Sequence, residues 1–506
     1  MNPLPASFVV LATIVWSVNA HAESVVAEIR IERSGGFHQT QLMGAADAGV
    51  KTRSWRDRQD LRGIVFRLPS GLPQASIDGG DMVDAIHLVT SYAAIGDPSS
   101  AVFSVRFRGT DRFVSALLIS GDPWTDLAVL RVDANDVQRP IAALAMEQCG
   151  GRFQIGQQVI GDLGNADKGR KGRVSKIDRS PADTATSQSA ELLPLRQLPT
   201  SLHDYGTLAQ VDFPSSVRHA PLGSLIYAGS RDILDTDNDL DSPRAAGMVL
   251  HHRRGGTRAN NTCFVVTFDH QMQQTLAQMV TGRAAAFGFI GAELMDAPRS
   301  EGALIRFAVP GLPAHDSGLR SDDLVVAIDD VPIQSSRDMF REISRRAPGT
   351  KIRLKYHAGV GFGRVTDAVG AETVTIRLGK KRLPLRRPSF AIRPPPQWRG
   401  MQVEYTTALP LRPRIGNQRI GENKVNRTAV SILRVEIDSP AWVAGCRAGQ
   451  EIESVAGLPV DNPERFYEIV NDDDVTASKE GAIVVRVRSD RMVQSLLIPK
   501  GDVPGR

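Results

Sequence analysis

Residues 121–133 read GDPWTDLAVLRVD and combine a turn with a strand that opens on an acid. The pair Asp122-Pro123 favours a turn, because proline fixes φ and the aspartate carboxylate can accept from the backbone that follows. The apolar run Leu127–Leu130 is typical of a half-buried strand. Asp126 stands at the mouth of this strand, where a carboxylate is costly unless a neighbour neutralises it or donates to it. The stretch predicts a strand that begins with a functional acid.

In chymotrypsin-like proteases such an acid orients the catalytic histidine, and GDPWTDLAVLRVD closely resembles the aspartate stretch of the HtrA/Deg serine protease family. That family places its histidine in a segment of the form VTNAHVV. Here residues 89–97 read VTSYAAIGD, with Ala93 in the place of the histidine. The family's nucleophile lies in GNSGGPLL, and residues 219–226 read HAPLGSLI, with Pro221 in the place of the serine. The resemblance implies a chymotrypsin-like double β-barrel.

The two replaced positions argue against proteolysis. Alanine can neither take nor deliver a proton, so no general base stands at position 93 beside Asp126. Proline offers no hydroxyl, and it lacks the N–H that normally serves as an oxyanion donor. Losing one such donor costs about 3–4 kcal/mol of transition-state stabilisation. With its triad positions occupied by Ala93, Asp126 and Pro221, the chain is predicted to be an inactive homologue of a serine endopeptidase.

A serine endopeptidase with a rewired site is the alternative. Its candidate nucleophile is Ser224, and its candidate bases are His87, His219 and His252. Against it, Ser224 lies beyond a glycine in what should be a descending strand, and a lone histidine is more often structural than catalytic.

No cofactor or metal is expected. Residues 235–241 (DTDNDLD) have the acidic spacing of a calcium loop, but Leu240 replaces the glycine at the sixth position and Ala246 the bidentate glutamate. We expect a hairpin tip there. The three cysteines have no CxxC spacing, so neither a zinc site nor a disulfide framework is indicated, although Cys149 and Cys263 can pair if the fold brings them together.

A binding module follows the barrels. Residues 287–291 read FGFIG, and then come VPGLPA at 309–314, SGL at 317–319 and DDLVVAI at 322–328. This order resembles the HtrA-type PDZ domain, which implies that a peptide C-terminus binds between a strand edge and a helix. We expect Gly288 to let backbone N–H groups converge on the terminal carboxylate. The predicted peptide-binding residues are Phe287, Gly288, Phe289, Ile290 and Gly291.

The same order of motifs recurs in residues 435–446 (VEIDSPAWVAGC), 448–452 and 457–460. Gln450 stands where the first module has an aspartate, and Cys446 takes the place of Leu319. With the insertion at 406–427, whether this second groove binds a ligand stays open.

The beginning of the chain predicts export. Residues 1–22 contain an apolar core and end in Ala20-His21-Ala22, the small-x-small pattern of a signal peptidase site, so cleavage is expected after Ala22. The family resemblance implies the periplasm, or secretion. A net charge of +5 over 506 residues does not favour nucleic-acid binding.

The sequence therefore predicts a mainly β chain: a chymotrypsin-like double β-barrel followed by two PDZ-like α+β domains. Its predicted partners are exported polypeptides or protein C-termini bound by the first PDZ domain, and a homo-oligomer stays open. The predicted segments are a signal peptide at 1–22, an arm at 23–61, the protease-like domain at 62–282, a first PDZ domain at 283–379, a Pro/Arg-rich linker at 380–397 and a second PDZ-like domain at 398–500.

Overall fold

The computed structural model describes a large part of the 506 residues. The described ranges are 25–34, 56–70, 85–137, 139–149, 153–163, 169–179, 208–214, 220–228, 244–253, 261–297, 302–361, 370–382, 389–409, 428–472, 482–489 and 492–499. The signal peptide, His219 and the acidic stretch 235–241 lie outside them. The chain forms two compact units, the first built mainly from residues 1–285 and the second mainly from 286–506, and we describe each by itself.

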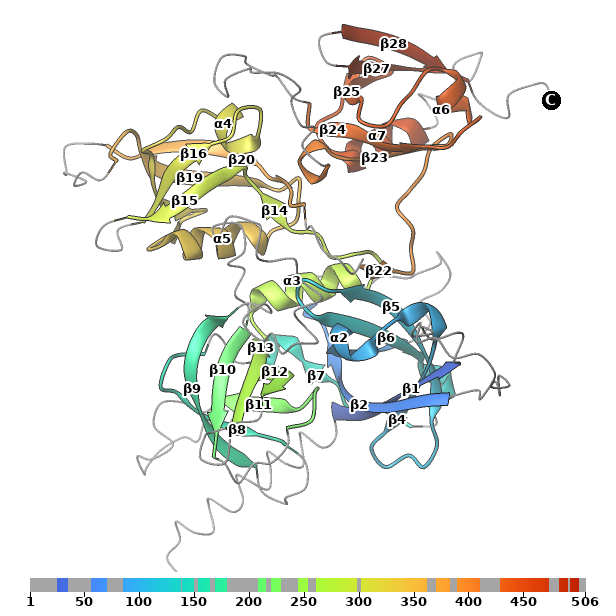
Figure 1. Cartoon of the computed structure of the whole chain (residues 1–506), viewed down its shortest axis with the longest axis vertical. Helices are drawn as coiled ribbons and strands as arrows, with labels where there is room; N and C mark the ends of the chain where they lie inside the picture. The colour runs from blue at the N-terminus through green and yellow to red at the C-terminus, as the bar shows by residue number, and fades with distance from the viewer. Residues whose placement is uncertain are drawn as a thin grey trace, which may run out of the picture. The chain divides into compact units, whose positions relative to one another are not determined.

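The first unit opens with a β-barrel (Figure 1). Six strands follow one another in the order β1-β4-β5-β6-β3-β2, and the pairing of β1 with β2 closes the ring. Their apolar side chains alternate inward, as period-2 strands require, and form one core. The bounds are β1 Val26–Ser34, β2 Arg56–Arg67, β3 Ala85–Ser91, β4 Ala101–Phe107, β5 Val114–Asp122 and β6 Leu127–Asp133, with the short strands β7 Leu144–Ala145 beside β2 and β22 Phe390–Ala391 beside β5.

A second closed barrel completes this unit, with its strands in the order β10-β13-β12-β11-β8-β9. Helix α3, His270–Met279, follows the last strand and is capped by Asp269, whose carboxylate accepts from the Met272 N–H. The remaining bounds are β8 Gln158–Gly161, β9 Arg170–Arg179, β10 Leu208–Phe213, β11 Leu225–Ala228, β12 Arg244–Arg253, β13 Asn261–Thr267, α2 Tyr92–Ile95, η1 Pro98–Ser100, η2 Ala134–Asp136 and η3 Met146–Gln148.

The second unit contains two α+β modules. In the first, a sheet in the order β15-β16-β17-β19-β20 packs against helix α5. Strand β15 is the edge of that sheet. The bounds are β14 Gly288–Phe289, β15 Ala292–Asp296, β16 Ala303–Ala308, α4 Pro313–Asp316, β17 Leu324–Ile328, β18 Val331–Pro332, α5 Ser336–Ser344, β19 Lys351–His357, β20 Glu372–Arg377 and β21 Gly379–Lys380.

The second module repeats this order with the sheet β23-β24-β25-β27-β28 and helix α7. Strand β23 is the edge that corresponds to β15. The bounds are β23 Met401–Tyr405, η9 Thr406–Ala408, β24 Val430–Val435, α6 Pro440–Val443, β25 Glu451–Val455, β26 Leu458–Pro459, α7 Pro463–Asn471, β27 Ile483–Ser489 and β28 Met492–Ile498. The predicted fold class, a double barrel followed by PDZ-like modules, is confirmed.

Two chemical features of the described chain bear on its function. Cys149, Cys263 and Cys446 are free thiols, so the pairing of Cys149 with Cys263 that the sequence left open does not form. None of the described helices has the length and apolar character needed to cross a bilayer.

Candidate functional site

Asp126 lies at the start of β6 and is almost completely buried, with 4% of its surface exposed. Its backbone is left-handed, at φ +58°, a conformation that an aspartate adopts only when its surroundings hold it there. Two donors satisfy its carboxylate: Ser91 Oγ donates to Oδ2 at 2.9 Å, and the Ala93 N–H donates to Oδ1 at 2.5 Å. The acid is therefore tied to the short helix α2, which begins immediately after Ser91.

A histidine from the second barrel also reaches this acid. His251 lies on β12, and its Nε2 is 3.0 Å from Oδ2 of Asp126. This is ion-pair distance, although the ring nitrogen does not have the alignment of a hydrogen bond. Sequence reasoning missed His251 and selected its neighbour His252. A β-bulge between Val249 and His251 explains the miss, because it breaks the alternation that would have told the two histidines apart.

The two replaced triad positions lie in short segments next to barrel strands. Ala93 is in the single turn of α2, and its contribution to Asp126 is a backbone N–H. Pro221 is half-buried in the turn before β11, where its carbonyl accepts from the Ser224 N–H at 3.2 Å. Neither side chain can transfer a proton or attack a carbonyl.

Ser224, the alternative nucleophile, is fully buried, and its Oγ has no hydrogen-bond partner among the described residues. Its backbone belongs to the barrel, since the Ser224 carbonyl accepts from the Val249 N–H at 2.9 Å. A serine that neither meets solvent nor bonds to a base lacks the arrangement of an activated nucleophile.

The candidate bases have separate positions. His87 lies on β3, and burial, reinforced by the charge of Arg131, lowers its pKa to about 4. His252 lies on β12, opposite Cys263 of β13.

The turn that contains Pro221 packs against a backbone carbonyl of the first barrel, that of Arg62. The Arg62 carbonyl on β2 accepts from Thr90 Oγ1 at 2.8 Å. Gly223 approaches the same oxygen, and a Cβ at this position would come within 2.2 Å of it. Gly223 also has φ +83°, so both its conformation and its contact require glycine.

The described residues contain neither a reactive thiol nor a cluster of metal ligands. Burial raises the pKa of Cys149 and of Cys263 to about 12, and that of Cys446 to about 11. These thiols therefore stay protonated at neutral pH and are poor nucleophiles. In the part of the chain that the structure describes, no three His, Cys, Asp or Glu side chains gather as a metal ion would need.

The second candidate site is the groove of the first PDZ-like module. The Gly288 N–H donates to the Arg346 carbonyl at 2.9 Å, so this N–H already has an acceptor within the module. The next N–H groups, of Ile290 and Gly291, have no acceptor among the described residues, and Gly291 has φ +75°. Successive free N–H groups in such a turn form an anion-binding concavity.

Neighbouring bonds hold this loop in place. The Ile290 carbonyl accepts from the Ala314 N–H at 2.8 Å, and the Gly291 carbonyl accepts from Val309 at 3.0 Å. Ile290 packs into the core, whereas Phe289 is half-buried. Phe287, the remaining predicted residue, is buried, and its carbonyl accepts from Lys381.

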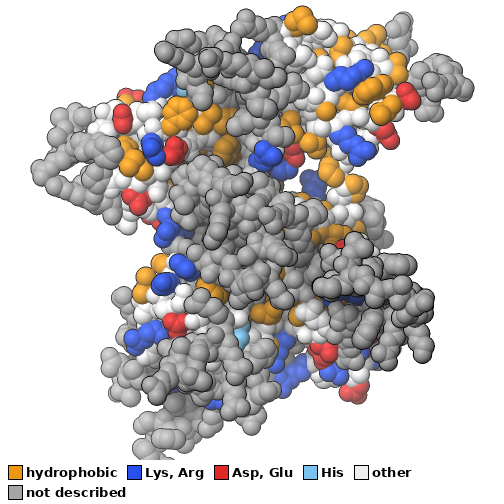
Figure 2. Space-filling view, viewed as in Figure 1, with side chains coloured by type: hydrophobic (Ala, Val, Ile, Leu, Met, Phe, Trp, Pro, Cys, Tyr) orange, Lys and Arg blue, Asp and Glu red, His pale blue; other side chains and the backbone are white. Residues whose placement is uncertain are grey.

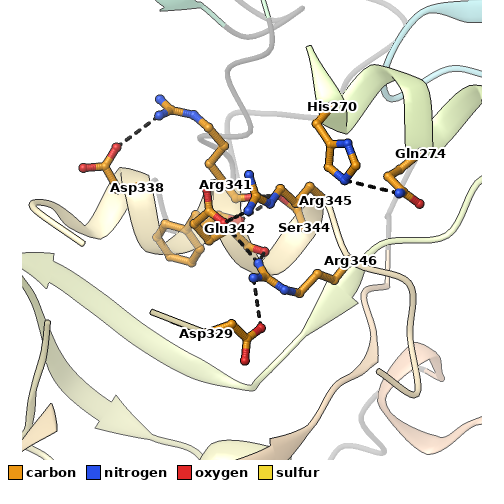
Figure 3. A network of polar contacts seen from close by, with 10 residues as sticks. His270, Gln274, Asp329, Asp338, Arg341, Glu342, Ser344, Arg345 and Arg346 are labelled. Carbon is orange, nitrogen blue, oxygen red and sulfur yellow. Dashed lines mark hydrogen bonds and ion pairs between the residues drawn. The ribbon is translucent and has the colours of Figure 1, made fainter. Parts of the chain in front are cut away.

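Beyond the loop, the edge strand β15 and helix α5 are neighbours. Asp296, the last residue of β15, accepts from Ser336 at the start of α5, at 2.8 Å from its N–H and 2.7 Å from its Oγ. At the other end of α5, Arg346 bonds to Asp329 at 3.0 Å and to the buried Glu342 (Figure 3). Both ends of the helix are therefore fixed by polar bonds.

Comparisons with known proteins agree with this geometry. The PDZ domain family matches residues 288–359. A "Probable periplasmic serine endoprotease DegP-like" of Rhizobium meliloti is 23% identical over 438 residues, which cover 84% of this chain and 74% of the relative. The protein of the same name from Halomonas elongata is 24% identical over 368 residues, which cover 71% of this chain and 67% of that relative. The chain is an HtrA/DegP-like protein with a PDZ domain.

A similarly named protein of Chlamydia trachomatis is 26% identical to this HtrA/DegP-like chain over 240 residues, which are 46% of this chain and 43% of the relative. Among solved structures, "HtrA-type protease AlgW with decapeptide" aligns with a TM-score of 0.43 and 16% identity, over 73% of this chain and 99% of that one.

The junction at Arg62 yields a stability prediction for the HtrA/DegP-like barrels. Gly156→Ala meets no atom within 4 Å but has φ +87°, so it isolates the cost of the left-handed backbone. We expect it to lower the free energy of unfolding by about 1–2 kcal/mol. Gly223→Ala adds a clash with the Arg62 carbonyl and should cost at least about 3 kcal/mol. Urea denaturation of both variants measures the difference, and equal losses would show that the barrel gives way freely at this junction.

Asp122 predicts a pH dependence. Burial, opposed by its bonds to Thr125, raises its pKa from 3.8 to about 6. Because the folded pKa is above the unfolded one, its contribution to stability is fully present below about pH 4 and is lost as pH rises through 6. The loss amounts to about 3 kcal/mol. Asp122→Asn keeps an acceptor for Thr125 but does not titrate, so its unfolding free energy should fall less between pH 4 and 7. A wild-type–variant difference that stays constant over this range would refute the assignment.

Proposed function

We propose that this HtrA/DegP-like protein is exported to the periplasm, binds the C-termini of polypeptides through its first PDZ domain and does not hydrolyse them. The observation that carries the proposal is the free N–H pair of Ile290 and Gly291 at the end of the open edge β15. The domain boundaries predicted from the sequence and the cleavage after Ala22 belong to the proposal. The naming of the relatives as periplasmic proteins supports the location.

Peptide capture follows from main-chain chemistry. The loop donors would bind the terminal carboxylate, and the free edge of β15 would pair with the peptide backbone, which gives affinity with little dependence on sequence. The apolar side chains of α5, Phe340 in particular, form the opposite wall. On the face drawn in Figure 2, acidic and basic side chains are interspersed, which suits binding by the main chain better than selection by charge.

The absence of hydrolysis in the proposal rests on Asp126. Its two oxygens already accept from Ser91 and the Ala93 N–H, and His251 faces it from the second barrel. In this proposal the carboxylate serves as a structural acceptor for Ser91 and the Ala93 N–H. Ser224, the serine near the nucleophile turn, is buried and has no base.

A rewired serine endopeptidase is the second candidate. The Asp126–His251 pair favours it, because an aspartate beside a histidine is two thirds of a catalytic triad. The naming of the relatives as serine endoproteases also favours it. Among the residues that the structure describes, no hydroxyl bonds to Nε2 of His251.

An activity-based probe separates these candidates. We expect no labelling of the mature protein by a fluorophosphonate, which requires an activated serine. The double variant Ala93→His/Pro221→Ser should also stay unlabelled, because His251 already lies against Asp126 and a new histidine would compete with it. Labelling of the wild type that disappears in Ser224→Ala would establish the rewired enzyme instead.

Peptide capture is tested by titrating the mature chain with a library of peptides, each made as a free acid and as a C-terminal amide. We expect the acids to bind with micromolar affinity, about −8 kcal/mol, and the amides at least about tenfold more weakly. Methylating the backbone nitrogens of a bound peptide should abolish binding, because the peptide then cannot pair with β15. Equal affinities for acids and amides would exclude the carboxylate site.

A further inference from the structure

The two PDZ-like modules share one hydrogen-bond frame around the groove loop. In each, two successive loop carbonyls accept from the segment that leads into the short helix α4 or α6. In each, the edge strand also has a β-bulge at the same distance from the loop glycine. The corresponding pairs are Ile290–Ala314 and Gly291–Val309 in the first module, and Arg399–Ala441 and Gly400–Glu436 in the second.

This frame assigns equivalent positions without any sequence alignment. The residue after the bulge is Leu294 in β15 and Val403 in β23. Helix α5 is capped by Ser335 and α7 by Asn462. The fifth residue after the cap is Phe340 in the first module and Tyr467 in the second. The two groove walls therefore differ by one hydroxyl at this position.

That hydroxyl occupies the strand edge of the second module. Val403 N–H donates to the Tyr467 hydroxyl at 3.2 Å, and the hydroxyl donates to the Pro396 carbonyl at 2.5 Å. Burial raises the pKa of Tyr467, so the hydroxyl keeps the proton that it donates. A peptide that adds to a sheet edge must bond to the N–H groups of that edge. Here the N–H of Val403 already has its acceptor.

The chain just before β23 closes the same groove from its loop end. Trp398 is 8% exposed and packs edge-on against Phe466 of α7, with ring centroids 5.8 Å apart. Its backbone exchanges two bonds of 2.8 Å with Met401, which fold the loop onto the start of the strand. In the first module, Phe289 instead pairs with Gly379 of β21.

We propose that Tyr467 is a built-in occupant of the second groove, where its hydroxyl takes the place of a peptide carbonyl on β23 and keeps this groove closed to peptides. The first groove is open because Phe340 has no hydroxyl to offer to β15. The predicted weakening of peptide binding rests on the proposed function, whereas the predicted changes in amide exchange do not.

We call the bond between the Val403 N–H and the Tyr467 hydroxyl the latch. Amide hydrogen exchange in the full mature chain tests it, with single-residue resolution from fragmentation mass spectrometry. Removing the hydroxyl by Tyr467→Phe should accelerate exchange at Val403 on the order of 2- to 10-fold, because the N–H loses its acceptor. The matched control is Tyr405→Phe, which removes a hydroxyl of the same module that bonds to Glu464 at 2.9 Å. It should leave Val403 unchanged. Unchanged exchange in Tyr467→Phe, or equal acceleration in both variants, overturns the latch.

The reciprocal variant transfers the latch to the open groove. Phe340→Tyr places a hydroxyl beside Leu294 and should slow exchange at that residue and weaken the free-acid peptides described above about tenfold. If the wild type binds none of these peptides, the proposed function fails, while exchange at Val403 and Leu294 still decides the latch. Faster or equal exchange at Leu294 in Phe340→Tyr would contradict the equivalence of the two positions.

Discussion

The buried carboxylate of Asp126 is the constraint on which the first unit depends. A carboxylate at that depth is tolerated only when polar partners surround it. Ser91 at the end of β3 and the Ala93 N–H in α2 donate to it, and His251 of β12 lies at ion-pair distance. The two barrels therefore share one electrostatic centre, even though a proton-transferring side chain at position 93 is missing. Removing any donor would leave part of the charge unsatisfied, which explains why the aspartate and its left-handed backbone fit this chain independently of catalysis.

The second unit shows how one frame can carry two different grooves. The loop carbonyls, the bulge and the helix cap fix the backbone of both modules in the same way. What differs is chemistry at single positions: Trp398 in place of Phe289, and Tyr467 in place of Phe340. Because main-chain pairing supplies the affinity of such a groove, one side-chain hydroxyl on an edge N–H has more effect than several changes of apolar side chains would have.

The sequence was sufficient for the fold, because strand alternation and glycine-bearing turns are local signals. GDPWTDLAVLRVD and the segments VPGLPA and VEIDSPA predicted the barrels and both modules that the sheet topology shows. Contacts between distant segments were not visible. His251 was missed because a bulge on β12 shifts the alternation. The sequence singled out the whole loop 287–291, and it does not show that the Gly288 N–H already bonds to the Arg346 carbonyl. The role of Tyr467 depends on which residue of β23 lies opposite it on α7, and only the folded chain shows that this residue is Val403.

These sites share one physical logic, namely that a functional polar group is defined by whether its partner comes from the same chain. Asp126 has Ser91, the Ala93 N–H and His251 as partners inside the barrels. Val403 finds Tyr467 inside its own module. The N–H groups of Ile290 and Gly291 find no acceptor among the described residues. Since a polar group without a partner costs free energy unless solvent or a ligand satisfies it, this loop is where a ligand carboxylate gains the most.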